Sequence, residues 1–183
     1  MKLFIKPIAV SALLSILLLS AEAFAALEAG TEAPDFSAAA SLGGEGFQFS
    51  LAESLENGPV VVYFYPKAFT AGCTIEAHMF AEATDEFAEY NTSVIGVSTD
   101  DIDTLHEFSV SECSSKFPVA SDEEGSVVNA YDAAMANGMA ARISYVIVPG
   151  GEIIHVLEAR APEGHIHESM AAVKNWAASQ HNL

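Results

Sequence analysis

The feature that most constrains the fold is a near-continuous apolar run from Pro59 to Tyr65, with the sequence PVVVYFY. A run this rich in β-branched and aromatic residues predicts a strand buried on both faces, as happens when helices cover both sides of a sheet. Beyond Thr74 the apolar residues recur at every fourth position, which predicts a helix over residues 74–89 with one apolar stripe. The stripe consists of Ile75, Met79, Ala83 and Phe87.

The rest of the chain alternates between strand and helix patterns. The expected elements are a small hairpin around Gly43 and Gly44, a strand over 93–98, a helix over 102–113, a short helix over 126–134, a hairpin with strands 143–148 and 152–157, and a helix over 167–180. A β-α-β unit followed by a hairpin and a helix is the thioredoxin plan. We therefore expect an α/β protein with a thioredoxin-like fold: a central mixed sheet flanked by helices, with an N-terminal β-hairpin extension.

Large apolar side chains at helical spacing are expected to form the core or a pocket wall rather than a cofactor site. They are Phe69, Phe80, Phe87, Leu105, Phe108, Met170, Val173 and Trp176.

The first 25 residues are predicted to be a secretory signal peptide. Lys2 and Lys6 form a positive region, Ile8 to Leu19 an apolar run, and Ala23-Phe24-Ala25 a site for cleavage after Ala25. The run is shorter than the ~20 residues that span a bilayer, which disfavours the alternative of a transmembrane anchor. Residues 26–183 are then a single domain of an exported protein, in an oxidising compartment such as the bacterial periplasm.

Charge excludes several classes of partner. The chain has 25 acidic residues against 7 Lys and Arg, a formal net charge of -18. Nucleic-acid binding needs basic groups to replace the counterions of phosphates, and anionic membrane surfaces repel such a chain. We interpret the charge as a solvated acidic surface; a salty habitat or a basic partner is the alternative. Two cysteines without a Cys-x-x-Cys motif also exclude zinc ribbons and iron–sulfur scaffolds.

The stretch after the apolar strand carries the candidate chemistry. The strand ends at Pro66, a short loop follows, and Cys73 lies where the helix begins. A helix N-terminus carries about half a positive charge and several unpaired N–H groups, which stabilise a thiolate, the reactive form of cysteine. Thr70 can place a hydroxyl beside the sulfur, and Pro66, which lacks an N–H, can wall the pocket. These residues predict a reactive cysteine.

Four motifs in the correct order resemble those of the peroxiredoxins. The spacing Pro66-x-x-x-Thr70-x-x-Cys73 is similar to the active-site signature of that family. The other matching segments are Ala33–Phe36 (APDF), Lys116–Asp122 (KFPVASD) and Arg142–Ile147 (RISYVI). The preceding strand, Lys67, Gly72 and Glu76 are most similar to the bacterioferritin-comigratory-protein (Q-type) branch of the alkyl hydroperoxide reductase/thiol-specific antioxidant family. The resemblance covers most of residues 26–183.

The resemblance implies a thiol-dependent peroxidase that reduces hydrogen peroxide and organic hydroperoxides without a metal or organic cofactor. Cys73 would be the peroxidatic cysteine, whose thiolate attacks the peroxide and becomes a sulfenic acid. Thr70 and the Cys73 N–H would hold the peroxide oxygens, and Pro66 would shield the sulfenic acid. Arg142 would stabilise the thiolate and the leaving oxygen. Glu76 is expected either to cap the helix or to position Arg142.

Cys113 is the only other cysteine in the chain. The Q-type branch often has a resolving cysteine five residues after the peroxidatic one, but that position here is His78. Some family members carry the resolving cysteine near the end of the third helix, so the resemblance implies that Cys113 forms an intramolecular disulfide with Cys73. Two alternatives remain open: a permanent structural disulfide, and a bystander Cys113 with resolution by an external thiol.

Two other functions compete with a peroxidase. A thiol–disulfide oxidoreductase on the same fold is disfavoured by the lack of Cys-x-x-Cys. A non-catalytic interaction domain with a Cys73–Cys113 disulfide would not require Thr70, Pro66 and Arg142 together. The expected partners are a hydroperoxide and a periplasmic thiol or thioredoxin-like reductant, and the chain is expected to be a monomer or homodimer.

The pair His165-x-His167 is expected to be solvent-exposed rather than metal-binding, because no carboxylate or thiol lies at ligand spacing.

Overall fold

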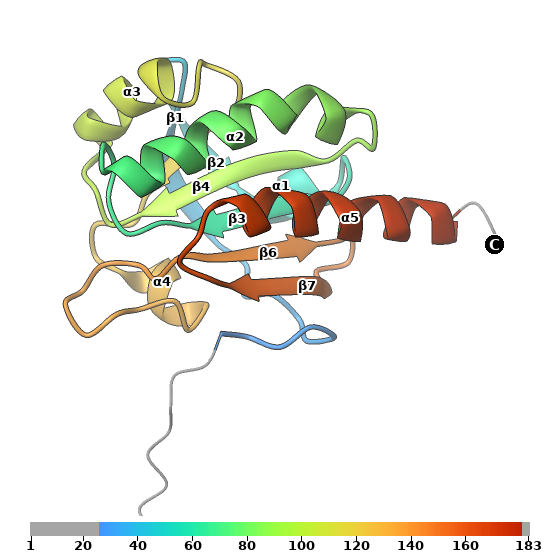
Figure 1. Ribbon diagram of the computed structural model, residues 1–183. Coiled ribbons are helices and arrows are strands. Elements are labelled where there is room, and N and C mark those ends of the chain that lie inside the picture. Colours follow the sequence, from blue (N-terminus) through green and yellow to red (C-terminus); the bar gives the residue numbers. More distant parts are fainter. Residues whose placement is uncertain (1–25, 181–183) are drawn as a thin grey trace, which may run out of the picture.

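The apolar run forms β3 (Val60–Phe64), which lies inside a seven-stranded sheet of order β2-β1-β5-β4-β3-β6-β7 (Figure 1). The structure is a computed structural model that describes residues 26–180. Strand β3 pairs in parallel with β4 (Ser93–Ser98) and antiparallel with β6 (Ile143–Ile147), so the sheet is mixed as expected. All of β3 is buried, because helices cover both faces of the sheet.

Two antiparallel hairpins form the outer parts of the sheet, and both were predicted. Strand β1 (Ser37–Leu42) pairs with β2 (Glu45–Ser50) to form the N-terminal extension, and β6 pairs with β7 (Ile153–Glu158). Strand β5 (Val119–Ser121), which joins β1 to β4, was not predicted from the sequence. A strand of only three residues is too short to show a period.

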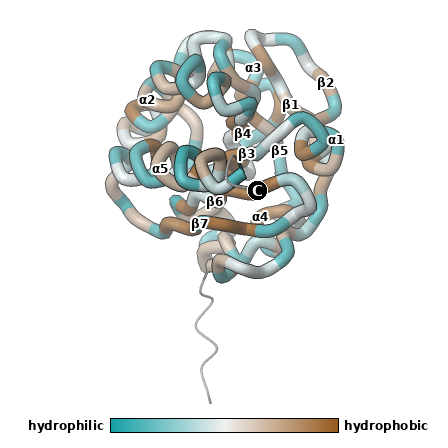
Figure 2. Tube along the Cα trace, turned by 90° about the vertical axis from the view of Figure 1, so that its right-hand side faces the viewer, coloured by the Kyte–Doolittle hydropathy of each residue, from teal (hydrophilic) through white to brown (hydrophobic). Residues whose placement is uncertain are grey.

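Helices form a layer on each face of the sheet. One layer consists of α2 (Ala71–Ala88), α3 (Ile102–Ser111) and α5 (Glu163–Gln180); α1 (Leu51–Leu55) and α4 (Ser126–Ala130) belong to the other. Because side chains alternate along a strand, Val61 and Tyr63 of β3 pack under the first layer, while Val62 and Phe64 pack on the opposite face. Figure 1 shows α2 and α5 in front of the sheet, and Figure 2 shows hydrophobic stretches along the strands. The thioredoxin-like class is therefore confirmed.

The predicted stripe of α2 is partly wrong. Ile75 is 49% exposed, and Met79 and Ala83 are only half-buried. The helix instead buries the face that contains Cys73, Glu76, Ala77, Phe80, Ala81 and Phe87. The predicted stripe was based mainly on the spacing of large apolar residues. The face that contacts the sheet also contains two small alanines, Ala77 and Ala81, and the buried Glu76.

Of the other residues predicted to lie in the core, most are buried and two are not. The confirmed ones are Phe80, Phe87, Leu105, Phe108, Met170 and Val173, which are all buried. Phe69 is 48% exposed at the end of a loop, and Trp176 is half-buried near the end of α5.

The predicted signal peptide, residues 1–25, lies outside the described residues. Within residues 26–180, no helix has the length and apolar character needed to cross a bilayer.

Candidate active site

Cys73 lies in the first turn of α2, at the end of the sheet where β3 ends. Thr70 is the N-cap with extended backbone angles, and Cys73 is the third helical residue. Among the described residues, no side chain caps the N–H groups of this first turn. They therefore remain available to a negative charge, which is the condition that favours a thiolate. The Cys73 side chain is buried.

The loop between β3 and α2 is held by a carboxylate that the sequence analysis missed. Asp100 accepts a hydrogen bond through Oδ2 from the Ala68 N–H at 2.8 Å and another from the Ser98 hydroxyl at 2.9 Å. The next residue, Phe69, has a φ of 60°, a backbone angle that residues other than glycine rarely adopt. Asp100 thus anchors a strained loop. The available signal was its position two residues after the end of β4, the parallel neighbour of β3.

Arg142 faces the cysteine from the start of β6. The antiparallel register pairs Phe64 with Ile143, so the end of β3 lies beside the residue that precedes β6. From there the Arg142 Nη2 donates to the Cys73 Sγ at 3.3 Å. A Cβ at Gly72 would lie 3.1 Å from the same Nη2, so the close approach of the guanidinium favours glycine at this position. The predicted pairing of Arg142 with Cys73 is present.

Glu76 is the second partner of Arg142. It lies one helical turn after Cys73, is fully buried, and accepts a hydrogen bond through Oε2 from the Arg142 Nη1. Of its two expected roles, the structure has it positioning Arg142. Among the described residues its Oε1 has no hydrogen-bond partner. Burial raises the pKa of the Glu76 carboxyl to about 8, although Arg142 acts in the opposite direction.

This raised pKa has a consequence for the electrostatics of the site. Below about pH 8 the Glu76 carboxyl holds a proton, so it orients the guanidinium without neutralising it. The positive charge of Arg142 is then compensated by the Cys73 sulfur when that sulfur is ionised. Burial of the pair strengthens this attraction, because the local dielectric constant is low.

We expect Glu76→Gln to change the pH dependence of stability. From about pH 5 to about pH 8, folded Glu76 retains a proton that the unfolded chain releases, so the free energy of unfolding of the wild type falls as pH rises. The slope relative to the variant approaches about 1.4 kcal/mol per pH unit. Urea unfolding of both proteins across this range measures it. A difference between the two that stays constant with pH would contradict the raised pKa.

The other loop residues have the following positions. The Thr70 hydroxyl donates to the Lys67 carbonyl at 2.9 Å, so its hydrogen points into the loop rather than to the sulfur. Lys67 is exposed. Pro66 and Arg142 both border a hollow of about 630 Å³. Its other lining residues are Met135, Ala141, Glu158, Ala159 and Arg160.

Cys113 lies just beyond the end of α3 and is fully buried, with a free thiol like that of Cys73. Its N–H donates to the Phe108 carbonyl at 3.1 Å. Burial, together with the neighbouring charge of Glu112, raises the pKa of the Cys113 thiol well above its usual range. Cys113 is therefore a neutral, shielded thiol in this state, in contrast to Cys73, which faces an arginine.

The segment around Cys113 is both strained and tied to α2. Ser114 and Ser115 have φ values of 50° and 56°, two successive left-handed residues without glycine. On either side, ion pairs join the segment to α2: His78 with Glu112 at 3.0 Å, and Asp85 with Lys116 at 3.1 Å. Surface ion pairs contribute at most about 1 kcal/mol each. These two ion pairs therefore contribute little to holding the segment against α2.

One histidine prediction is wrong. His165 is fully buried rather than solvent-exposed, because the start of α5 turns its ring towards β6, where Ser144 provides a polar partner. His167 is exposed as expected. Within residues 26–180, no three His, Cys, Asp or Glu side chains converge in a group that could hold a metal ion.

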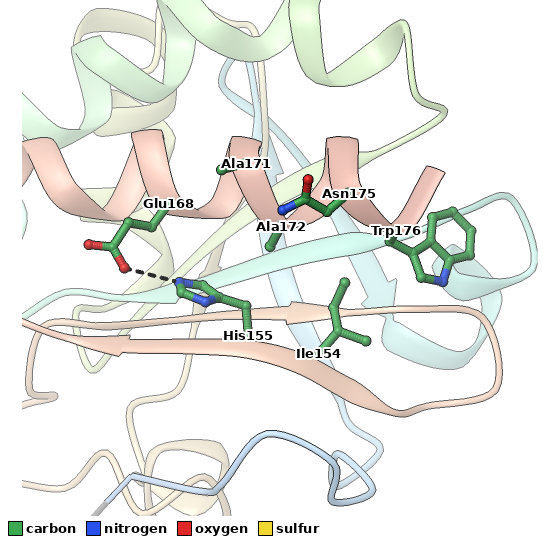
Figure 3. A pocket seen from close by; sticks show the side chains of 7 residues that line it. All are labelled: Ile154, His155, Glu168, Ala171, Ala172, Asn175 and Trp176. Atoms are coloured by element: carbon green, nitrogen blue, oxygen red, sulfur yellow. Dashed lines mark ion pairs between the residues drawn. The ribbon is translucent and has the colours of Figure 1, made fainter. Parts of the chain in front are cut away.

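A second hollow lies between β7 and α5 and shares no residue with the Cys73 site (Figure 3). In Figure 3 His155 points from β7 towards Glu168 of α5, with 3.6 Å between His155 Nε2 and Glu168 Oε2, and Trp176 lies at the other end. The lining is completed by Ile154, Ala171, Ala172 and Asn175. Nothing in this groove resembles the reactive constellation around Cys73.

A thioredoxin-like sheet that places a buried cysteine at a helix N-terminus against an arginine defines the peroxiredoxins, a class of thiol-dependent peroxidases. Comparison with protein families agrees: the model of the AhpC/TSA family matches residues 29–156. The chain belongs to the AhpC/TSA family and is a thiol-dependent peroxiredoxin.

Individual relatives indicate the branch within that family. The chain is 32% identical over 157 residues to peroxiredoxin Bcp of Escherichia coli K12. This alignment covers 82% of this chain and 95% of the relative. The crystal structure of peroxidoxin BcpB from Mycobacterium tuberculosis has a TM-score of 0.74 at 27% identity, with 81% of this chain and 97% of that chain covered. Peroxiredoxin Q of Xanthomonas campestris has a TM-score of 0.67 at 28% identity and covers 76% and 90% respectively. The resemblance to the Q-type branch is confirmed.

Proposed function

We propose that Cys73 is the peroxidatic cysteine and that the protein reduces hydrogen peroxide and organic hydroperoxides through it. The observation that carries this proposal is the position of the Cys73 sulfur. It lies 3.3 Å from the Arg142 guanidinium, and Cys73 belongs to the uncapped first turn of α2. Two positive influences thus converge on one buried thiol. Cys113 has neither of them, which makes Cys73 the nucleophile.

The first step forms one bond and breaks one. The Cys73 thiolate attacks the terminal peroxide oxygen, an S–O bond forms, and the O–O bond breaks. The leaving oxygen takes up a proton and departs as water or an alcohol, while Cys73 becomes a sulfenic acid. Arg142 stabilises the charge that moves onto the leaving oxygen, and the first-turn N–H groups hold the peroxide. The Thr70 hydroxyl, which donates to the Lys67 carbonyl, takes part as an acceptor for a peroxide O–H. Pro66 walls this pocket.

We propose that the peroxide approaches through the hollow bordered by Pro66 and Arg142, because the Arg142 Nη2 also contacts the Cys73 sulfur. Its volume of about 630 Å³ is larger than a hydrogen peroxide molecule needs. Met135 and Ala141 give it an apolar side that suits the alkyl part of an organic hydroperoxide.

The sulfenic acid is resolved by Cys113. The Cys113 sulfur attacks the sulfenic sulfur, a disulfide forms, and water leaves; an external dithiol then reduces the disulfide. Because Cys73 begins α2 and Cys113 lies beyond the end of α3, the two sulfurs meet only after local unwinding. The strained Ser114–Ser115 pair favours opening at Cys113, and the two surface ion pairs of the segment oppose it only weakly.

The cellular setting proposed from the sequence is export to the bacterial periplasm, with a periplasmic thiol or thioredoxin-like protein as reductant. A donor for a chain of net charge -18 is expected to present a neutral or basic face.

The intact mass of the reduced protein from residue 26, measured after one equivalent of hydrogen peroxide, tests the proposal. We expect a loss of two hydrogens within seconds, as the Cys73–Cys113 disulfide closes. An unchanged mass, with peroxide left in solution, would remove the proposed function.

Cys113→Ser is the matched control for the second step. Without a resolving thiol, Cys73 is expected to gain one or more oxygens instead of losing hydrogens. If the wild type also gains oxygen and forms no disulfide, Cys113 is a bystander and an external thiol resolves the sulfenic acid.

A further inference from the structure

We infer that His165 is a positioning residue for Arg142, acting through a closed set of hydrogen bonds around the backbone that carries the arginine. This inference rests on the proposed role of Cys73. We define the His165 bridge as the side chain of His165 with its two partners, Ser144 and Ala159. The His165 Nδ1 lies 2.9 Å from the Ser144 Oγ, and its Nε2 lies 3.0 Å from the Ala159 carbonyl oxygen.

The partners determine which ring nitrogen carries the proton. A backbone carbonyl can only accept, so the Nε2 of His165 must donate to Ala159. The ring is buried beside Arg142, and burial lowers the pKa of His165, which keeps the ring neutral. The unprotonated Nδ1 therefore accepts the hydroxyl hydrogen of Ser144. Of the two tautomers of the neutral ring, only the one with the proton on Nε2 gives both nitrogens a hydrogen-bond partner.

The bridge encloses the backbone of Arg142. The N–H of Ala159 donates to the Arg142 carbonyl at 3.3 Å, and Ser144 follows Arg142 by two residues in β6. A path of hydrogen bonds thus runs from Arg142 through Ala159 and His165 to Ser144 and returns along the strand. On its other side Arg142 follows the connection between α4 and β6, where the Ala141 N–H donates to the Ala133 carbonyl at 2.7 Å. The His165 bridge is the tie that reaches the Arg142 backbone from α5, in addition to the Ala141 hydrogen bond and the pairing of β6 with β3 and β7.

The same bridge holds one wall of the hollow beside Arg142, which we propose as the entry for the peroxide. Ala159 and Arg142 both line this hollow. Loss of the donor to the Ala159 carbonyl would release this wall and the arginine together. A displacement of about 1 Å in a catalytic group is enough to lower a rate by about 100-fold.

The test compares two variants of buried residues in α5. His165→Leu removes both hydrogen bonds of the ring, whereas Val173→Ala lowers stability from the same helix without touching the bridge. The rate of Cys73 oxidation by hydrogen peroxide is followed by stopped flow under conditions where each variant is folded. We expect His165→Leu to slow the reaction about tenfold or more, Val173→Ala to stay within about twofold, and His165→Gln, which keeps a donor for Ala159, to recover part of the loss.

Coupling to Arg142 separates positioning from a general structural role. In an Arg142→Gln background, His165→Leu is expected to cause no further loss of rate, because its effect passes through the guanidinium. The same tenfold loss in both backgrounds, or an unchanged rate for His165→Leu, would overturn the inference. Either result leaves the proposed function intact as long as wild-type Cys73 reacts; failure of the wild type to react would instead remove the proposed function.

Discussion

Replacing Cys73 with serine is expected to abolish peroxide reduction, with a loss of at least about 10⁴-fold in the rate of hydrogen peroxide consumption. A serine hydroxyl stays protonated at neutral pH even beside Arg142, and it cannot pass through a sulfenic acid. The helix N-terminus and the guanidinium would then have no ionised sulfur to stabilise. Peroxide consumption with a small dithiol as reductant measures the effect.

Cys113→Ser is the matched control, because it makes the same atomic change at another fully buried cysteine. We expect this variant to keep the rate of the first oxidation within about twofold, since Cys113 touches neither Arg142 nor the first turn of α2. Both variants bury a hydroxyl in place of a thiol, so their stabilities are expected to fall by similar amounts, about 1–3 kcal/mol. Equal loss of the first oxidation by peroxide in the two variants would contradict Cys73 as the nucleophile.

The parts of the fold that the sequence predicted are those with a strong local period. The run ending at Tyr65 is apolar on both faces, and the turn at Gly150–Gly151 separates two clear strands, so β3 and the last hairpin were found. Strand β5 and the contact face of α2 were missed because tertiary pairing and small side chains determine them. Neither the short strand β5 nor the contact face of α2 produces a regular spacing of apolar residues in the sequence.

The site divides in a similar way. The spacing from Pro66 to Cys73 and the resemblance of the Arg142 segment predicted which residues meet. What could not be predicted is the support around them. Asp100 and His165 act through backbone groups, and a hydrogen bond to a main-chain amide or carbonyl depends on how strands and loops meet rather than on any neighbouring residue type.

Arg142→Gln is expected to lower the rate of Cys73 oxidation by about 10²–10³-fold, the typical loss when one preorganised donor to a developing charge is removed. It also leaves Glu76 buried without its partner. The cost depends on pH: the carboxyl can remain neutral at low pH, but ionisation at higher pH would place an unpaired charge in the core. We therefore expect the variant to lose about 1–3 kcal/mol of stability relative to the wild type near pH 6, and more above about pH 8, where the wild-type carboxyl ionises beside Arg142.

The double variant Glu76→Gln/Arg142→Gln separates the two roles of the arginine. With no carboxyl left to ionise, its stability is expected to recover towards that of the wild type at pH 8, while the rate of oxidation stays as low as in Arg142→Gln. Urea unfolding and stopped-flow oxidation of the same preparations measure both quantities. If restoring stability also restored the rate, the guanidinium would serve only to compensate Glu76, and the 3.3 Å contact with the Cys73 sulfur would carry no part of the reaction.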